Sequence, residues 1–289
     1  MAEITADAGD IVDDAPKHRH GVMFWAASSW LILIVAVAAL FDLLPFKDPT
    51  RISPGNKYQG VFSEGHLLGT DQLGRDILAR LAEGARISMF IAVLTVLVGI
   101  TVGGLIGTTV GYFGGRIERL TMALVNMALS FPSLILLLGV IAFAGQSLRN
   151  IVIVFCVLAV PGYVRFARAS TLSLKQREWV LASEMMGAKR SRIIFRGLMP
   201  EVLITLITFG LLAVGGVIVA EGVTAFLGVG VPPPRSTWGQ MIADGQNDFD
   251  DDVIHTALIP ATTMFLTILS LNLVGDGLRR RFQVREAQI

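Results

Sequence analysis

The chain is poor in the residues that support most soluble folds. Charged residues make up 16% of its 289 residues, against roughly 25% in a typical soluble domain. It contains one cysteine, Cys156, which excludes a disulfide framework and a metal site built from paired cysteines. Because Cys156 lies within an apolar run, we interpret it as a small packing residue. The composition therefore argues against an ordinary soluble domain and against a disulfide-stabilised one.

The motifs of common catalytic sites are also missing. There is no Gly-x-x-x-x-Gly-Lys-[Ser/Thr] phosphate loop, no His-Glu-x-x-His zinc motif and no Gly-x-Ser-x-Gly nucleophile elbow. Of the four histidines only His18 and His20 are close together, so we expect no metal site and no cofactor bound by this chain. The sequence therefore predicts a protein that is not an enzyme.

What the chain has in quantity is hydrophobic residues, 53% of the total, and they gather in long runs. A helix needs about 20 mostly apolar residues to cross a bilayer. Helices are favoured over a barrel because these runs are continuously apolar rather than alternating. The predicted fold is an all-α membrane protein with six transmembrane helices, at Val22–Leu44, Ile87–Tyr112, Thr121–Ala144, Ile151–Ala169, Val202–Leu227 and Val253–Val274.

Basic residues predict the orientation of these helices. If both termini are cytoplasmic, the inner segments hold 16 of the 24 Lys and Arg residues and the outer segments hold eight. Cytoplasmic loops collect Lys and Arg, so we place both termini in the cytoplasm. The first apolar run is longer than the roughly 7–15 residues of a secretory signal, and we expect it to be a retained anchor.

The predicted organisation follows from these runs. It comprises a disordered cytoplasmic tail over 1–20, the first transmembrane helix over 21–44, an extracytoplasmic segment over 45–84, a core over 85–278 and a cytoplasmic tail over 279–289. Near the end of the extracytoplasmic segment, the apolar residues Ile77, Leu78 and Leu81 favour a short helix lying on the outer membrane surface.

The second apolar run has glycine at every fourth position, at Gly99, Gly103, Gly107, Gly111 and Gly115. On a helix of 3.6 residues per turn this spacing builds a nearly straight, smooth stripe. Such stripes let a neighbouring helix approach closely. Tight helix packing is therefore the favoured interpretation, and lining of a permeation path is the alternative.

Two acidic residues near the ends of apolar runs are functional candidates, because a charge within a membrane is costly. Glu221 lies near the outer end of the fifth run. Three roles are open for it: closing an outer gate, bonding to loop backbone, or reaching interfacial water. Asp276 lies at the inner end of the sixth run. Arg279 and Arg280 follow it by three and four residues, in range for pairing, so we favour a structural ion pair there.

A charged segment over 165–200 interrupts the apolar runs on the predicted cytoplasmic side. Within it, Glu178 to Gly187 predicts a short helix. Glu178 lies in the first turn, where negative charge suits the helix dipole, and Gly187 suits a left-handed C-terminal cap. Because Glu178 and Glu184 interrupt the basic residues and no aromatic stacking set accompanies them, we expect no nucleic-acid binding.

This helix places Trp179, Ala182 and Met186 on one face, at spacings i, i+3 and i+7. A helix this short is marginal alone, so it needs a surface to dock on. The small residues Ala182 and Ser183 permit close approach of a partner, and Trp179 or Met186 suits a partner's groove. Folding back onto its own bundle is the alternative.

Four motifs in order resemble the permeases of ABC importers. The family's cytoplasmic coupling segment has Glu-x-x-x-Ala-Ala, then Gly, then Leu-Pro, and this chain has Glu178, Ala182-Ser183, Gly187 and Met199-Pro200. Three further blocks are similar to the C-type permease subunits of dipeptide and oligopeptide importers, the DppC/OppC group with its nickel and glutathione relatives. These blocks are Leu68–Asp76 with Gly84–Ser88, Glu221–Gly239 and Asn272–Arg279.

The resemblance implies the fold of a type I ABC-importer permease, embedded in the lipid of a bacterial-type inner membrane. It also implies the partners: a homologous second permease subunit, two ATPase subunits that hold ATP and Mg, and an extracytoplasmic binding protein that delivers dipeptides or oligopeptides. In that family a segment corresponding to about 177–190 is the coupling helix. The resemblance thus assigns ATPase coupling to Glu178, Trp179, Ala182, Ser183, Met186 and Gly187.

Other functions remain open at this point. Within this class, the alternative is import of nickel chelates, glutathione or another small solute by the same architecture. Outside this class, the alternatives are a stand-alone channel and a membrane enzyme. The chain departs from the family pattern at Ser183, Glu201 and Arg280. These departures leave the detail at the inner helix ends open.

Overall fold

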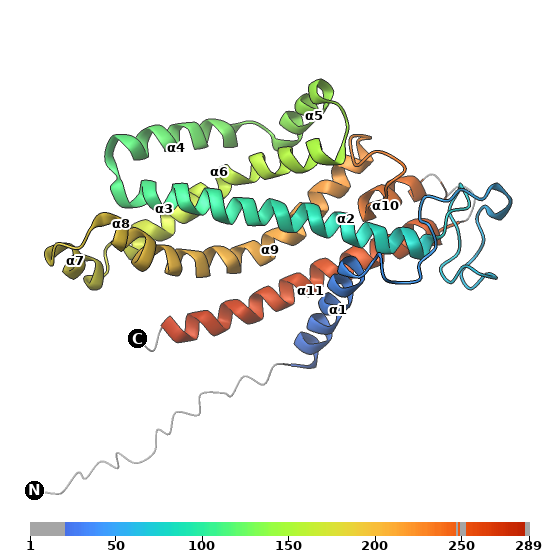
Figure 1. The fold of residues 1–289 in the computed structure, drawn as a ribbon, viewed down its shortest axis with the longest axis horizontal. Helices are drawn as coiled ribbons and strands as arrows, with labels where there is room; N and C mark the ends of the chain where they lie inside the picture. Colours follow the sequence, from blue (N-terminus) through green and yellow to red (C-terminus); the bar gives the residue numbers. More distant parts are fainter. Residues whose placement is uncertain (1–20, 247, 249–252, 287–289) are drawn as a thin grey trace, which may run out of the picture.

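The computed structural model describes residues 21–246, 248 and 253–286. The predicted tail over 1–20 lies outside these residues. In chain order the elements are α1 (Val22–Ala39), η1 (Pro54–Asn56), α2 (Ile77–Val98), η2 (Gly99–Gly103), α3 (Gly104–Phe113), α4 (Gly115–Ser130), α5 (Ser133–Ala144), α6 (Leu148–Leu174), α7 (Glu178–Met185), α8 (Arg190–Arg192), η3 (Ile193–Leu198), α9 (Met199–Phe226), α10 (Trp238–Gln246) and α11 (His255–Glu286). Figure 1 shows the long helices lying side by side, with α7 at one end and the long loop before α2 at the other.

Five helical segments in the described part of the chain are long and apolar enough to cross a membrane. They are Val22–Ala39, Ile77–Phe113, Leu148–Leu174, Arg190–Phe226 and His255–Arg279. Counting the bent pair α4 and α5 as one span gives six. The all-helical membrane architecture expected from the apolar runs is therefore confirmed.

The third predicted span is a bent pair rather than one helix. Helices α4 and α5 meet at an angle of 83°. The break lies at Phe131 and Pro132, where Phe131 has extended backbone angles. Proline lacks the N–H that would continue the helix and disfavours helical angles at the residue before it. Hydropathy alone does not reveal this corner, but Pro132 within the apolar run predicts a kink there, and the bend confirms it.

The prediction of a separate surface helix at Ile77 is wrong. Helix α2 begins at Ile77 and continues without a break into the span, and both Ile77 and Ala79 are buried. Asp76 caps this start, because its side chain accepts a hydrogen bond from the Ala79 backbone N–H. The predicted boundary at 84 therefore falls inside α2. At the other end of the chain, α11 continues to Glu286, so the predicted tail from 279 is helical over its described part.

The glycine stripe lies against α6. A Cβ atom on Gly103 would lie 2.6 Å from the Cβ atom of Tyr163, and one on Gly111 would lie 3.0 Å from that of Thr171. Gly99 and Gly107 meet α6 in the same way, whereas Gly115 has open space around it. The four glycines from 99 to 111 thus let the two helices approach at backbone distance.

The wide helical turn η2 explains why this stripe stays aligned with α6. A four-residue step on a regular α-helix turns by about 400°, so the stripe would drift by about 40° at each step. η2 is a π-helical segment whose wider turn takes up extra residues. The sequence spacing alone does not reveal this correction.

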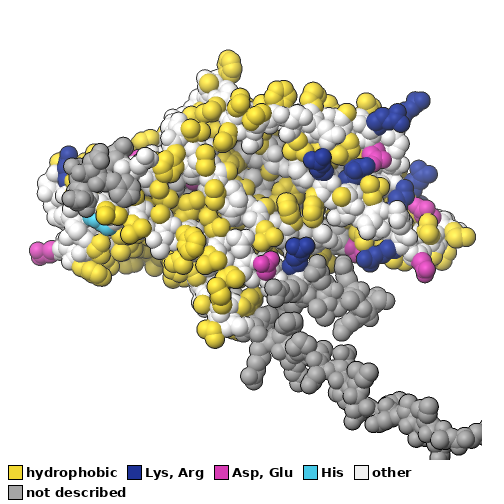
Figure 2. All heavy atoms as spheres, turned by 180° about the vertical axis from the view of Figure 1, so that it is seen from behind, with side chains coloured by type: hydrophobic (Ala, Val, Ile, Leu, Met, Phe, Trp, Pro, Cys, Tyr) yellow, Lys and Arg dark blue, Asp and Glu magenta, His cyan; other side chains and the backbone are white. Residues whose placement is uncertain are grey.

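The surface divides into an apolar middle and a charged end. Figure 2 shows hydrophobic side chains over the middle of the molecule, with Lys and Arg gathered toward one end. This is the end that carries α7 and the end of α11, opposite the long loop (Figure 1). An apolar belt with basic residues to one side is the pattern expected of a membrane protein whose α7 end is cytoplasmic.

Candidate functional site

Helix α7 at the basic end is the short helix that the sequence predicts, and its end is fixed by backbone bonds. Gly187 has φ +77°, in the left-handed region. Its N–H donates to the carbonyl of Glu184, and the Ala188 N–H donates to the carbonyl of Ser183, both at 3.0 Å. This pair of bonds is a Schellman motif, which requires a left-handed residue at the glycine position. The glycine therefore stops α7 and turns the chain toward α8.

One side of α7 faces its own bundle. Val180 is fully buried, and Trp179 is half-buried. The indole ring of Trp179 lies on the bare backbone of Gly197 in η3, where an added Cβ would come within 2.7 Å of it. The Ser183 hydroxyl donates to the Trp179 carbonyl at 2.7 Å. Trp179 thus points inward rather than toward a partner, because Gly197 leaves room for it.

The other side of α7 is exposed and apolar. Met185 is 90% exposed, Met186 is 80% exposed and Leu181 is 51% exposed, and Ala182 lies between them on the surface. Clustered exposed apolar side chains mark contact surfaces. Methionine adapts its shape to a partner. The exposed side of α7 has the character of a docking surface.

An open groove of about 800 Å³ runs between the end of α7 and η3. It is lined by Ser183, Met186, Gly187, Ala188, Lys189, Ser191, Arg192, Phe195 and Arg196. Three of these residues are basic and none is acidic, while Met186 and the half-exposed Phe195 supply apolar surface. The groove therefore suits a partner segment that presents acidic and apolar side chains.

Two polar contacts tie α7 to the long helices, and the sequence pattern did not reveal either. Arg177, just before α7, lies 3.5 Å from Glu201 in α9. Tyr112, in the last turn of α3, donates a hydrogen bond to Glu184 at 2.9 Å. Glu201 is one of the departures from the family pattern, and its contact places it at the junction of α7 and α9. No signal in the sequence singles out Tyr112, which looks like the end of an apolar run.

Glu221 is buried in α9, with 1% of its surface exposed, so it does not reach interfacial water. The Thr237 hydroxyl donates to one of its carboxylate oxygens at 2.7 Å. The same hydroxyl oxygen accepts from the Gln240 N–H at 3.1 Å, which caps the start of α10. The second carboxylate oxygen lies against Gly239. Through Thr237, Glu221 therefore connects α9 to the first turn of α10.

Asp276 lies exposed on α11 and forms no ion pair with any described side chain. Its predicted partner Arg279 is also exposed, and the side chain of Arg280 lies outside the described part. In the described residues, no three His, Cys, Asp or Glu side chains group to hold a metal ion.

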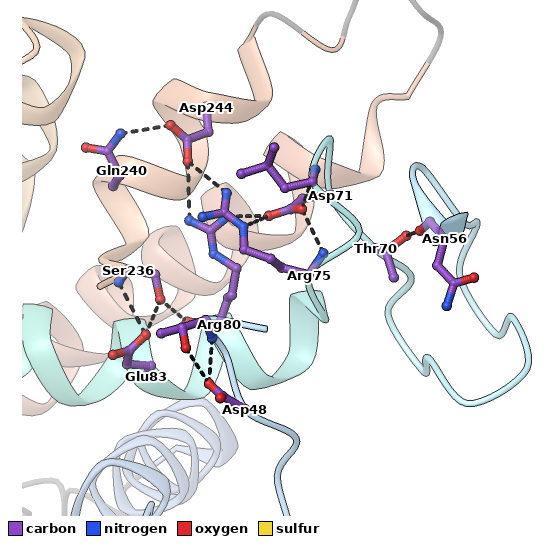
Figure 3. Close-up of polar contacts among 12 residues, drawn as sticks. Asp48, Asn56, Thr70, Asp71, Arg75, Arg80, Glu83, Ser236, Gln240 and Asp244 are labelled. Atoms are coloured by element: carbon purple, nitrogen blue, oxygen red, sulfur yellow. Dashed lines mark hydrogen bonds and ion pairs between the residues drawn. The ribbon is translucent and has the colours of Figure 1, made fainter. Parts of the chain in front are cut away.

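A buried cluster of charged residues ties the long loop to α2 and α10 (Figure 3). Arg75 lies 2.7 Å from Asp71, and Arg80 also pairs with Asp71. Asp244 in α10 lies 3.2 Å from Arg80 and 3.7 Å from Arg75. The side chains of Asp71, Arg75 and Arg80 are at most 8% exposed. The block Leu68–Asp76, noted in the sequence for its resemblance, therefore forms a structural clasp at the outer end.

The cluster keeps Asp71 ionised. Burial by itself raises the pKa of Asp71, but the positive charge of Arg80 and the backbone N–H of Arg75 lower it more, so the pKa lies below its usual value. Two buried guanidinium groups facing two carboxylates balance each other. These ion pairs connect the outer end of α2 to the long loop and to α10.

Residues 99–287 match the family model of the "Binding-protein-dependent transport system inner membrane component". This match spans more than half of the chain. The chain belongs to this family. It is a multi-pass inner-membrane permease component of an ABC importer.

Curated relatives of this permease cover most of its length. It is 33% identical over 256 residues to the glutathione transport system permease protein GsiD of Pectobacterium atrosepticum, covering 88% of this chain and 84% of the relative. It is 33% identical over 245 residues to the dipeptide transport system permease protein DppC of Alkalihalophilus pseudofirmus, covering 85% and 80%. Both relatives belong to the groups that the sequence motifs resemble.

A solved structure has the same fold. A chain of the MetNI methionine ABC transporter, in a structure of inward-facing conformations, superposes with a TM-score of 0.58 at 20% identity, covering 71% of the permease and 95% of that chain. At this identity the similarity concerns the fold alone. It places the permease's helix arrangement among those of ABC importers.

Proposed function

We propose that this permease forms half of the translocation pathway of an ATP-driven importer of dipeptides or oligopeptides. The observation that carries the proposal is the surface of α7. An exposed methionine-rich face and a basic groove lie side by side at the predicted cytoplasmic end. In the proposed function this surface seats an ATPase subunit, and closure of the ATPases around ATP displaces α7.

In this proposal the permease itself catalyses no reaction. ATP and Mg bind at two partner ATPase subunits, which supply the free energy of transport. The groove between α7 and η3 supports an ATPase partner with acidic side chains, because Lys189, Arg192 and Arg196 line it. The coupling residues are then the exposed Ala182 and Met186, with Trp179, Ser183 and Gly187 holding the shape of α7. Glu178 supports the first turn of the helix.

A homologous second permease subunit would complete the pathway. Helices α4 and α5 support this assignment, because large apolar side chains on α4 lack partners within the described chain. Leu120 is 69% exposed, Leu124 is 62% exposed and Met127 is 57% exposed. An extracytoplasmic binding protein would deliver the substrate to the opposite end, where the charged clasp joins the long loop to α2 and α10.

The peptide assignment rests on the relatives, one named for dipeptides and one for glutathione, which is itself a short peptide. Glutathione, nickel chelates or another small solute remain the alternatives within the same architecture.

Purification with a tag on this permease, in mild detergent, tests the docking surface. We expect an ATPase subunit to co-purify with the unaltered chain. Ala182→Arg should reduce the recovered ATPase at least tenfold, because it places a bulky charge in the middle of the exposed face. Gly55→Arg, at an exposed glycine of the long loop where an added Cβ meets no atom within 4 Å, is the matched control at the opposite end of the molecule and should leave recovery unchanged. Equal recovery with both variants would place the ATPase elsewhere.

A further inference from the structure

A buried tyrosine of α3, Tyr112, contacts α7. Tyr112 is 4% exposed. Its hydroxyl donates to a carboxylate oxygen of Glu184 at 2.9 Å. Glu184 lies in the last turn of α7, next to the exposed Met185 that would meet a partner. A displacement of α7 therefore acts directly on the Tyr112 ring.

Tyr112 is also held from a second side. Lys175, which ends α6, donates to the Tyr112 backbone carbonyl at 2.7 Å. The same ammonium group lies 5.3 Å from the centre of the Tyr112 ring, within the range of a cation–π contact. The ring thus sits at a junction of three helices, α3, α6 and α7, and cannot rotate away without losing these contacts.

The residue before Tyr112 packs α3 closely against α6. Gly111 precedes it and lies against the backbone of α6, where an added Cβ would come within 3.1 Å of the Arg168 carbonyl. Because no side chain separates the two backbones there, α3 and α6 have little room to slide independently. A force on Tyr112 therefore moves α3 and α6 together.

The other polar contact between α7 and the bundle is weaker. Arg177 and Glu201 are 3.5 Å apart, with side chains 47% and 36% exposed, and such an exposed pair contributes little. Trp179 and Val180 hold α7 against η3 by apolar packing. Apolar packing opposes separation of α7 from η3 but does not fix the orientation of α7, because it is not directional. The hydrogen bond of Tyr112 is directional, and its donor lies on a buried side chain.

We propose that Tyr112 is the positioning residue that couples α7 to the membrane helices, through its hydrogen bond to Glu184. This inference rests on the proposed function, in which an ATPase displaces α7. Loss of the bond should leave ATP hydrolysis in place and reduce the movement that hydrolysis produces. Tyr112 acts through Glu184 and touches neither ATP nor the transported substrate.

The test uses the complete complex in proteoliposomes, with its ATPase and binding-protein partners, and compares uptake of radiolabelled alanyl-alanine with ATP hydrolysed. Tyr112→Phe removes only the hydroxyl group. We expect hydrolysis within twofold of the unaltered complex and at least a fivefold fall in peptide per ATP. A hydrogen bond to a carboxylate changes an equilibrium roughly 10- to 100-fold, so this fall is within reach.

Three further variants separate coupling from simple structural damage. Glu184→Gln keeps an acceptor oxygen and should retain peptide per ATP, whereas Glu184→Leu should lose it as Tyr112→Phe does. The double variant Tyr112→Phe/Glu184→Leu should be no worse than either single change, because both remove the same bond. Thr109→Val removes a hydroxyl that bonds only within α3 and is the matched control.

The outcomes distinguish this inference from the proposed function. If the unaltered complex holds no ATPase or imports no alanyl-alanine, the proposed function fails and Tyr112 is not at issue. If the unaltered complex works and Tyr112→Phe keeps its peptide per ATP, the inference is overturned. Losses that multiply in the double variant would overturn it as well, since they would mean two independent contacts.

Discussion

Replacing Gly107 by alanine tests whether the glycine stripe holds the helices together. A Cβ atom at Gly107 would lie 2.7 Å from the Cβ of Ala167 and 3.0 Å from the Arg168 nitrogen, and it would also meet the Val164 carbonyl. Two of these obstacles are backbone atoms of α6, which cannot rotate aside. The two helices must therefore move apart to admit one methyl group.

The expected cost follows from two opposing terms. Overpacking a tight contact costs about 1–3 kcal/mol, and the backbone obstacle places Gly107 at the upper end. Alanine in place of glycine favours a helix by about 1 kcal/mol. The net destabilisation is therefore about 2 kcal/mol, which lowers the melting temperature of a domain of this size by about 4–8 °C.

The single cysteine provides the assay, because it lies in α6, the helix that the stripe contacts. Cys156 is half-buried. Its labelling by a maleimide, followed on this chain's own peptide by mass spectrometry, reports when α6 opens on heating. Gly107→Ala should shift the labelling midpoint down by the amount given above. Gly162, in α6 itself, has no atom within 4 Å of an added Cβ, so Gly162→Ala is the matched control and should not lower the midpoint. Equal shifts for the two variants would refute the packing argument.

Two other predictions concern the ends of the molecule. Gly187→Val should loosen α7 without any clash, because Gly187 has φ +77° and open space around it, and a branched side chain disfavours that backbone by about 1–2 kcal/mol. We expect less ATPase to co-purify with Gly187→Val than with the control variant Gly162→Val. Equal recovery from the two variants would count against the role of Gly187 as the C-terminal cap of α7. The second prediction concerns the effect of low pH on the clasp at Asp71. Because the folded pKa of Asp71 lies below its usual value of about 3.9, its stabilisation is present above that value and is lost as pH falls through the lower, folded pKa. Protease cleavage of the loop over 45–76 should therefore rise below about pH 4, and Asp71→Asn should be cleaved faster at pH 7, with a flatter pH profile. An unchanged profile would exclude Asp71 from the clasp's stability.

Local patterns in the sequence predicted the elements that depend on local physics. The short helix at Glu178 and its stop at Gly187 follow from charge placement and from one residue that tolerates positive φ, and α7 has both. The apolar runs likewise predicted the membrane helices, because each buries its own backbone bonds whatever its neighbours are. These features require no knowledge of what packs against them.

Features that depend on distant contacts could not be predicted in this way. Trp179 faces inward because Gly197, 18 residues later, leaves space for its ring. The start of α2 at Ile77 depends on Asp76 and on the pairing of Arg80 with Asp244, far along the chain. Such residues look like ordinary surface positions until the fold brings their partners beside them.

The continuous helix from Ile77 to Phe113 joins the two ends of the molecule. At about 1.5 Å per residue its 37 residues span about 55 Å. The charged clasp holds its outer end through Arg80, and the hydrogen bond of Tyr112 ties its inner end to α7. Between them the glycine stripe seats it on α6 without intervening side chains, and η2 is the one wide turn within it. In the proposed function, a displacement of α7 would therefore move α3 and α6 together, and η2 is the place where the helix would bend before its outer end.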